Sequence, residues 1–120
     1  MLKKIRLELA RTPDRPDGDP DVAYEIVAPL DSSGHLDAEG WRAHRADCRV
    51  AHFRPGRPVE TGVLLHRPGG AWAISYRPGE EDNEALFKLD RHLLKPGEYV
   101  SIAGHDGAAL PYKVASVETV

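Results

Sequence analysis

Three side chains with metal-binding chemistry lie four residues apart in this sequence. On a continuous helix, His44, Cys48 and His52 would share one face and could offer a metal ion two imidazoles and a thiolate. The segment after Cys48 is β-like and leads into a Pro-Gly turn, so a helix that ends near Asp47 would let the three side chains diverge. No fourth ligand is evident. We therefore predict no metal and no cofactor, and keep these three residues as the candidate ligands.

An arginine-rich segment overlaps the same region. Five arginines against one aspartate give a net charge of +4 across residues 41–57. Guanidinium groups match oxyanions, although a solvated charged face is the simpler interpretation. Aromatic and arginine side chains dominate interaction hot spots. We therefore predict that a ligand- or partner-binding surface is formed by Trp41, Arg42, Arg45 and Arg49.

Catalytic motifs do not emerge from the sequence. It contains no G-x-S-x-G nucleophile elbow, no P-loop and no G-x-G-x-x-G. The six histidines are scattered, and spacing alone places none of them beside a serine or a carboxylate. We predict no catalytic residues and do not expect an enzyme. A small histidine-using metal-binding protein or barrel enzyme remains the alternative.

Composition sets further bounds. The chain has 120 residues, of which 41% are hydrophobic and 29% charged, as in a single globular domain spanning 1–120. Its one cysteine, Cys48, cannot form an internal disulfide, which favours the cytoplasm. No apolar stretch approaches the ~20 residues that would span a membrane. The net charge of -3 opposes binding to nucleic acid.

Turn signals organise the chain. Four tripeptides combine a basic residue, proline and glycine, and they start at residues 54, 67, 77 and 95. Proline presets the φ angle of the second turn residue, and glycine accepts the positive φ that the third residue of a type II turn requires. Each tripeptide therefore predicts a chain reversal between short strands of about 5–6 residues.

Alternating apolar and polar residues predict the strands. Between residues 3 and 9, Ile5, Leu7 and Leu9 fall on one face of an extended chain. A proline-rich loop is expected at 12–20. Further strand-like segments are 22–28, 49–53, 61–66, 71–76, 85–89, 99–103 and 112–117. In the fourth of these, Trp72, Ile74 and Tyr76 share a face that could floor a ligand pocket, although a sheet core is the interpretation we prefer.

One segment lacks alternation and favours a helix near residues 37–47. Asp37 is suited to cap its N-terminus, and Trp41 would pin it onto the sheet. The predicted fold is mainly β, an antiparallel barrel or sandwich of seven to eight short strands with this one short helix.

The chain as a whole resembles short bacterial proteins of unknown function. The resemblance is carried by residues 24–31, 35–42, 66–72 and 96–102. It implies a free-standing bacterial domain and transfers no catalytic residue. Together these observations lead us to expect a non-catalytic cytoplasmic β domain that binds a partner protein or a small molecule. A homodimer formed through exposed strand edges is a further prediction, and a structural subunit of a larger assembly is another reading.

Overall fold

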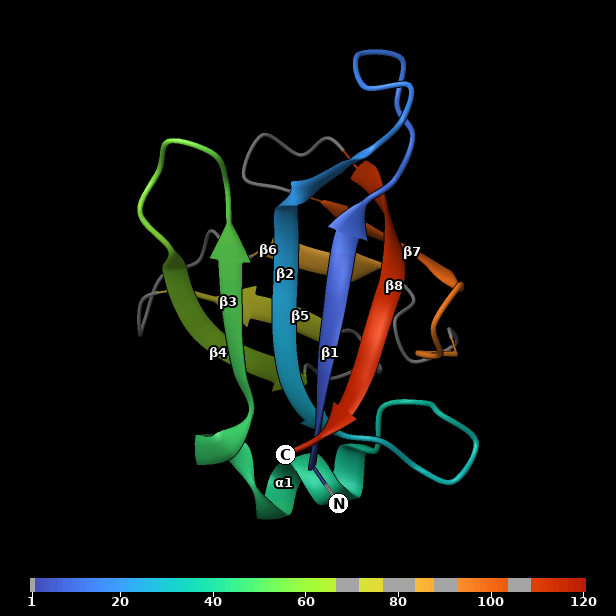
Figure 1. Cartoon of the computed structure of the whole chain (residues 1–120). Coiled ribbons are helices and arrows are strands. Elements are labelled where there is room, and N and C mark those ends of the chain that lie inside the picture. The colour runs from blue at the N-terminus through green and yellow to red at the C-terminus, as the bar shows by residue number, and fades with distance from the viewer. Residues whose placement is uncertain (1, 67–71, 77–83, 88–92, 104–108) are drawn as a thin grey trace.

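The chain folds into an antiparallel β-barrel (Figure 1). The computed structural model describes residues 2–66, 72–76, 84–87, 93–103 and 109–120, of which 84–87 are described by their backbone. Each strand pairs with the next along the chain, and the last pairs with the first. This confirms the mainly β prediction and selects the barrel over the sandwich. The strands are β1 (Leu2–Leu9), β2 (Asp19–Pro29), β3 (Arg49–Phe53), β4 (Glu60–His66), β5 (Trp72–Ser75), β6 (Glu84–Phe87), β7 (Tyr99–Ala103) and β8 (Ala109–Thr119).

The barrel interior is filled by side chains from every second residue along the strands. In β1, Ile5, Leu7 and Leu9 are buried as predicted, because successive side chains of a strand point to opposite faces of the sheet. The largest fully buried side chains of the described residues are Tyr24, Ile5, Leu7, Ile26, Leu64, Ile74, Leu94, Ile102, Val50 and Val100. Burial of this apolar surface stabilises the barrel.

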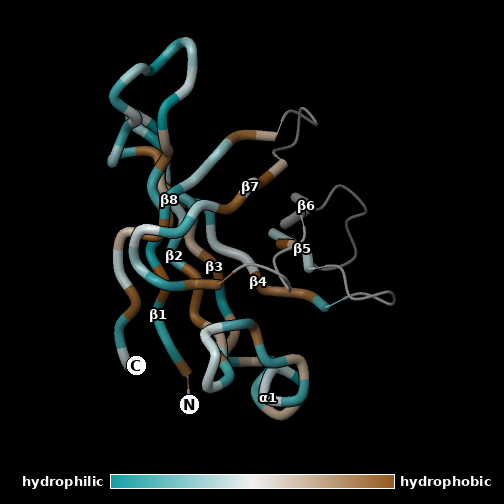
Figure 2. Tube along the Cα trace, turned by 90° about the vertical axis from the view of Figure 1, so that its right-hand side faces the viewer, coloured by the Kyte–Doolittle hydropathy of each residue, from teal (hydrophilic) through white to brown (hydrophobic). Residues whose placement is uncertain are grey.

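The predicted helix forms within residues 37–47. It comprises α1 (Ala38–Ala43) and the short 3-10 helix η1 (Arg45–Asp47). The Asp37 side chain caps α1 by accepting a hydrogen bond from the Glu39 amide at 3.1 Å. Gly40 lets the helix approach β2 closely, because a Cβ there would lie 3.0 Å from the Pro29 side chain. The helix lies at one end of the barrel in both orthogonal views (Figures 1 and 2).

Two of the four Pro-Gly turns fall on described residues. Gly56, between β3 and β4, has a φ of 70°, and Gly97, before β7, has a φ of 96°. These are the positive values that make glycine suitable at the third turn position. The tripeptides that start at residues 67 and 77 lie outside the described residues.

Two strands begin three residues earlier than the sequence predicts, at Asp19 instead of 22 and at Ala109 instead of 112. Pro20 and Pro111 discourage a strand assignment because proline cannot donate a ladder hydrogen bond. Both prolines nevertheless lie close to a strand's start, where this loss is tolerated, and the Pro111 carbonyl accepts a hydrogen bond from the Ala10 amide at 3.0 Å.

Closure of the barrel affects the predicted homodimer. Each of the eight described strands has a pairing partner on both sides, so the exposed edges on which that prediction relied are not found among them. A dimer would therefore have to form through the outer face or the ends of the barrel, and it stays a prediction.

Candidate functional site

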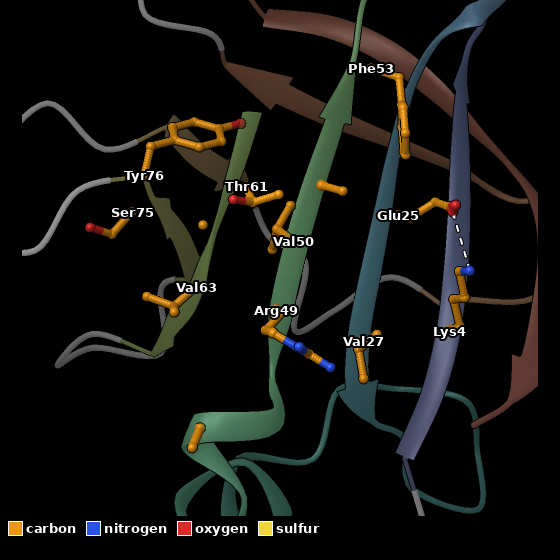
Figure 3. A pocket seen from close by; sticks show the side chains of 13 residues that line it. Lys4, Glu25, Val27, Arg49, Val50, Phe53, Thr61, Val63, Ser75 and Tyr76 are labelled. Atoms are coloured by element: carbon orange, nitrogen blue, oxygen red, sulfur yellow. Dashed lines mark ion pairs between the residues drawn. The ribbon is translucent and has the colours of Figure 1, made fainter. Parts of the chain in front are cut away.

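A concavity of about 680 Å³ lies on the outer face of the first five strands (Figure 3). We call it the outer groove. Its volume falls within the ~300–1,000 Å³ range of pockets that hold small molecules. The residues that line it are Lys4, Glu25, Val27, Ala46, Arg49, Val50, Ala51, Phe53, Thr61, Gly62, Val63, Ser75 and Tyr76.

Strand register explains why these residues meet. Lys4 of β1 lies opposite Val27 of β2, and Arg49 of β3 lies opposite Val63 of β4. The pairing of Ile26 with Val50 places Val27 beside Arg49, because neighbouring residues advance together along an antiparallel ladder. Val63 in turn lies opposite Ser75. One row across five strands therefore alternates cation, valine, cation, valine and hydroxyl.

A second row of outward residues lies two positions further along β2, β3 and β4, and it runs from the carboxylate of Glu25 to the hydroxyl of Thr61. Glu25 lies opposite Ala51, and Ala51 lies opposite Thr61. The Tyr76 ring reaches over β4 on the same side as Thr61 (Figure 3). Val63 is an exposed apolar side chain in this surface, with 41% of its area accessible. The groove thus combines an apolar floor with polar groups at its rim, as small-molecule sites do.

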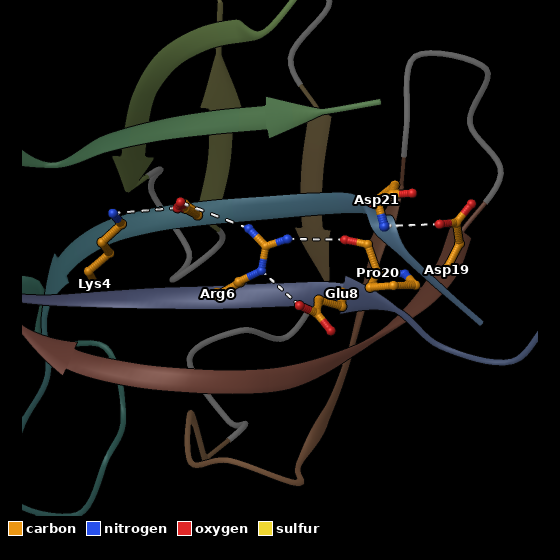
Figure 4. A network of polar contacts seen from close by, with 7 residues as sticks. Lys4, Arg6, Glu8, Asp19, Pro20 and Asp21 are labelled. Atoms are coloured by element: carbon orange, nitrogen blue, oxygen red, sulfur yellow. Dashed lines mark hydrogen bonds and ion pairs between the residues drawn. The ribbon is translucent and has the colours of Figure 1, made fainter. Parts of the chain in front are cut away.

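Glu25 is held by two cations. Lys4 Nζ lies 3.5 Å from one of its carboxylate oxygens, and the Arg6 guanidinium lies 3.9 Å from the other (Figure 4). Arg6 also donates to Glu8 at 2.7 Å and to the Pro20 carbonyl at 3.0 Å. Its guanidinium lies 5.9 Å from the centre of the Phe53 ring. The charges along this side of the groove therefore largely satisfy one another.

Arg49 differs from these residues. It is exposed and makes no ion pair or hydrogen bond through its side chain with any residue that the structure describes. In Figure 3 its side chain extends from β3 toward β2, on the side of Val27. The groove therefore contains one guanidinium whose charge the described part of the protein leaves uncompensated.

A second aromatic and basic cluster closes the end of the barrel where α1 lies. Trp41, His66 and Trp72 pack together, with ring centres 5.9 Å apart for the two tryptophans and 4.5 Å apart for His66 and Trp72. We call these three residues the tryptophan plug. Trp41 is 6% exposed, and its indole nitrogen donates to the Leu64 carbonyl at 2.8 Å. The Arg45 guanidinium covers the Trp41 ring at 4.7 Å. Trp41 therefore pins the helix to the sheet, as predicted.

The four residues predicted as one binding surface occupy different surroundings. Trp41 lies in the tryptophan plug, and Arg45 covers it from outside. Arg42 is exposed on α1, and Arg49 lines the outer groove. No observation on the described residues tests whether any of them binds a ligand or partner, so the prediction stands for each residue separately.

The candidate metal ligands are also dispersed. His44 is exposed at the end of α1, whereas Cys48 is fully buried. His52 is buried in β3 and stacks on Tyr24 with ring centres 4.0 Å apart. Among the described residues, no group of three or more histidine, cysteine, aspartate or glutamate side chains is placed to hold a metal ion. Burial raises the pKa of the Cys48 thiol, and the neighbouring Asp47 charge adds to the effect.

Several groove residues were not singled out from the sequence. Lys4, Glu25 and Val63 occupy outward positions of strands that were predicted, so alternation alone could have assigned them to the outer face. Which outward residues become neighbours depends on strand register, for which the sequence offers no direct signal. Tyr76, predicted on the aromatic stripe of the core, packs partly buried against the core and also lines the outer groove.

Comparison with known proteins identifies no relative. No protein-family model matches the chain, and no curated protein or solved structure is significantly similar to it. In the described residues, no helix is both long and apolar enough to cross a membrane. The functional argument therefore rests on the geometry of the outer groove.

Proposed function

We propose that this protein is a non-catalytic binding module that holds a small molecule in the outer groove. The observation that supports this proposal is a hollow of about 680 Å³ with an apolar floor and a few polar groups at its rim. The valines at positions 27 and 63 would contact the apolar body of the ligand. Arg49 and the hydroxyl groups at the other end would orient it.

The chemistry of the groove favours binding over catalysis. Glu25 is the one carboxylate among the described residues that line it, and that carboxylate is engaged by Lys4 and Arg6. No histidine is among those lining residues. General acid–base catalysis most often uses a histidine or a carboxylate that is available to take a proton. We further propose that the protein acts in the cytoplasm, where its single thiol, Cys48, stays reduced.

A matched pair of variants tests the proposal. Val63 and Leu110 are similarly exposed, at 41% and 40%, but only Val63 lines the groove. The probe is phenylnaphthylamine, a neutral aromatic molecule whose fluorescence rises in apolar surroundings. We expect the natural protein and Leu110→Glu to bind the probe with similar affinity, and Val63→Glu to bind it at least tenfold more weakly.

Three results would overturn the proposal. The first is an absence of fluorescence enhancement with the natural protein, and the second is equal binding of the probe by the two glutamate variants. The third is a dimer, seen by analytical ultracentrifugation, that Val63→Glu converts to a monomer, because a second copy of the chain would then cover the groove.

A further inference from the structure

We infer that the ligand of the outer groove is an amphiphilic anion, a free small molecule with an apolar body and one carboxylate, sulfonate or phosphate group. The anionic group would bind Arg49. This inference rests on the proposed function and adds the charge of the ligand and the residue that selects it.

The first argument is the balance of charge. Lys4 and Arg49 are cationic, and Glu25 is the one anionic residue among the described residues that line the groove. Glu25 is within 4 Å of both Lys4 and Arg6, whereas Arg49 has no ionic partner among the described residues. Arg49 is therefore the cation of the groove that is available to pair with an anionic ligand.

The second argument is the setting of Arg49. Val27 and Val63 flank it on the neighbouring strands, so a ligand seated between them would exclude water from one side of the guanidinium. Lower local polarity strengthens a charge-assisted hydrogen bond, and the planar guanidinium can donate two parallel bonds to one oxyanion. The valines would at the same time contact the apolar body of the ligand.

A second arginine cluster is less suited to an anion than Arg49. A smaller hollow at the C-terminal end of β3 is lined by Arg6, Arg54, Arg57 and Asp21. There Arg54 is paired with Glu60 and Arg6 with Glu8, while Arg57 makes no ion pair with a described residue but shares the hollow with the Asp21 carboxylate, which would repel an anion. Ions already paired within the protein lose those interactions when they bind an external anion, so their net gain is smaller.

The test compares two probes that share one ring system. Anilinonaphthalene sulfonate carries an anionic group that phenylnaphthylamine lacks. We expect Arg49→Gln to weaken binding of the sulfonate probe at least tenfold, which corresponds to ~1.4 kcal/mol, and to change binding of the neutral probe less than threefold. The matched control, Arg11→Gln, removes the same charge from an exposed position in the loop after β1, outside the groove, and should leave both affinities within threefold.

The outcomes separate the two proposals. If the neutral probe binds in the groove but Arg49→Gln leaves the sulfonate affinity unchanged, the inference about the anion fails while the proposed function stands. If Arg11→Gln weakens sulfonate binding as much as Arg49→Gln does, the anion responds to the overall charge and the assignment to Arg49 fails. If neither probe responds to Val63→Glu, the groove is not the binding site and both proposals fail.

Discussion

The outer groove and the tryptophan plug each place an arginine against an apolar surface, and these two arginines, Arg49 and Arg45, lie on either side of Cys48 in the sequence. In the plug, Arg45 covers the buried Trp41 ring, and the Trp41 indole donates to a backbone carbonyl. In the groove, Arg49 lies between two valines and has no side-chain partner among the described residues. Similar residue types thus have different roles, and the difference lies in whether the protein itself satisfies their interactions.

Removing the centre of the plug should have the largest effect. We expect Trp41→Ala to lower the free energy of unfolding by about 3–5 kcal/mol, since it deletes a large buried side chain and its hydrogen bond to Leu64. Urea denaturation followed by circular dichroism measures this change. A loss below about 1 kcal/mol would contradict the structural role.

A milder substitution at the same position keeps the comparison testable if Trp41→Ala does not fold. Trp41→Phe retains an aromatic ring but leaves the Leu64 carbonyl without its donor, which we expect to cost about 1–3 kcal/mol. Binding of phenylnaphthylamine to the groove should persist in this variant. Loss of that binding in a folded variant would show that the two regions are coupled.

The close approach of β4 and β5 at Gly62 is the next most sensitive point, because Gly62 and Ser75 both line the groove. A Cβ at Gly62 would lie 2.5 Å from the Ser75 carbonyl oxygen, so Gly62→Ala forces the two strands apart. We expect a loss of about 1–3 kcal/mol in the free energy of unfolding, measured by urea denaturation. Gly56→Asn is the control, because no atom lies within 4 Å of that position and asparagine tolerates its positive φ. Equal losses in both variants would argue against the close approach.

Replacing each of the two arginines by alanine compares the plug and the groove directly. Arg45→Ala should lower the free energy of unfolding by about 0.5–1 kcal/mol, because it removes the cation from the face of Trp41. Arg49→Ala should change stability by no more than about 0.5 kcal/mol, since it breaks no described contact. Thermal and urea denaturation of both variants provide the measurement. A larger stability loss for Arg49→Ala would assign it a structural role.

The smallest expected effect is a pH dependence at Cys48, which lies between Arg45 and Arg49 in the sequence. Burial raises the pKa of its thiol above the ordinary value of 9.0. The folded state therefore keeps a proton that the unfolded state loses, and stability is fully present below pH 9.0 and falls as the pH rises toward the folded pKa. Stability measured from pH 8 upward should fall more steeply for the natural protein than for Cys48→Ala. Parallel profiles would contradict this contribution.

Most of the secondary structure could be predicted because its signals are local. Alternation in β1, the Asp37 cap and the turn at Gly56 each depend on residues a few positions apart. The early start of β2 was missed because Pro20 is a local signal against a strand, whereas pairing with β1 outweighs it.

The candidate site was much less predictable. Arg49 was predicted to bind, but in company with Trp41, which instead lies in the tryptophan plug. Its actual neighbours, Val27 and Val63, are distant in sequence and meet it only through strand register. The alternation of each strand fixes which side chains point outward, but a register shift of two residues would keep them on that face and change their neighbours, so no local pattern could specify the groove.

The sequence by itself determined where the chain turns, which strand positions point inward, and that one short helix interrupts the β structure. These properties follow from the φ preferences of proline and glycine and from the two-residue period of a strand. Only the tertiary structure decided that β8 returns to β1, that Trp41 packs against His66 and Trp72, and that Arg49 lies between two valines. Those outcomes depend on packing and pairing between distant segments, whose energies are set only when the whole barrel has assembled.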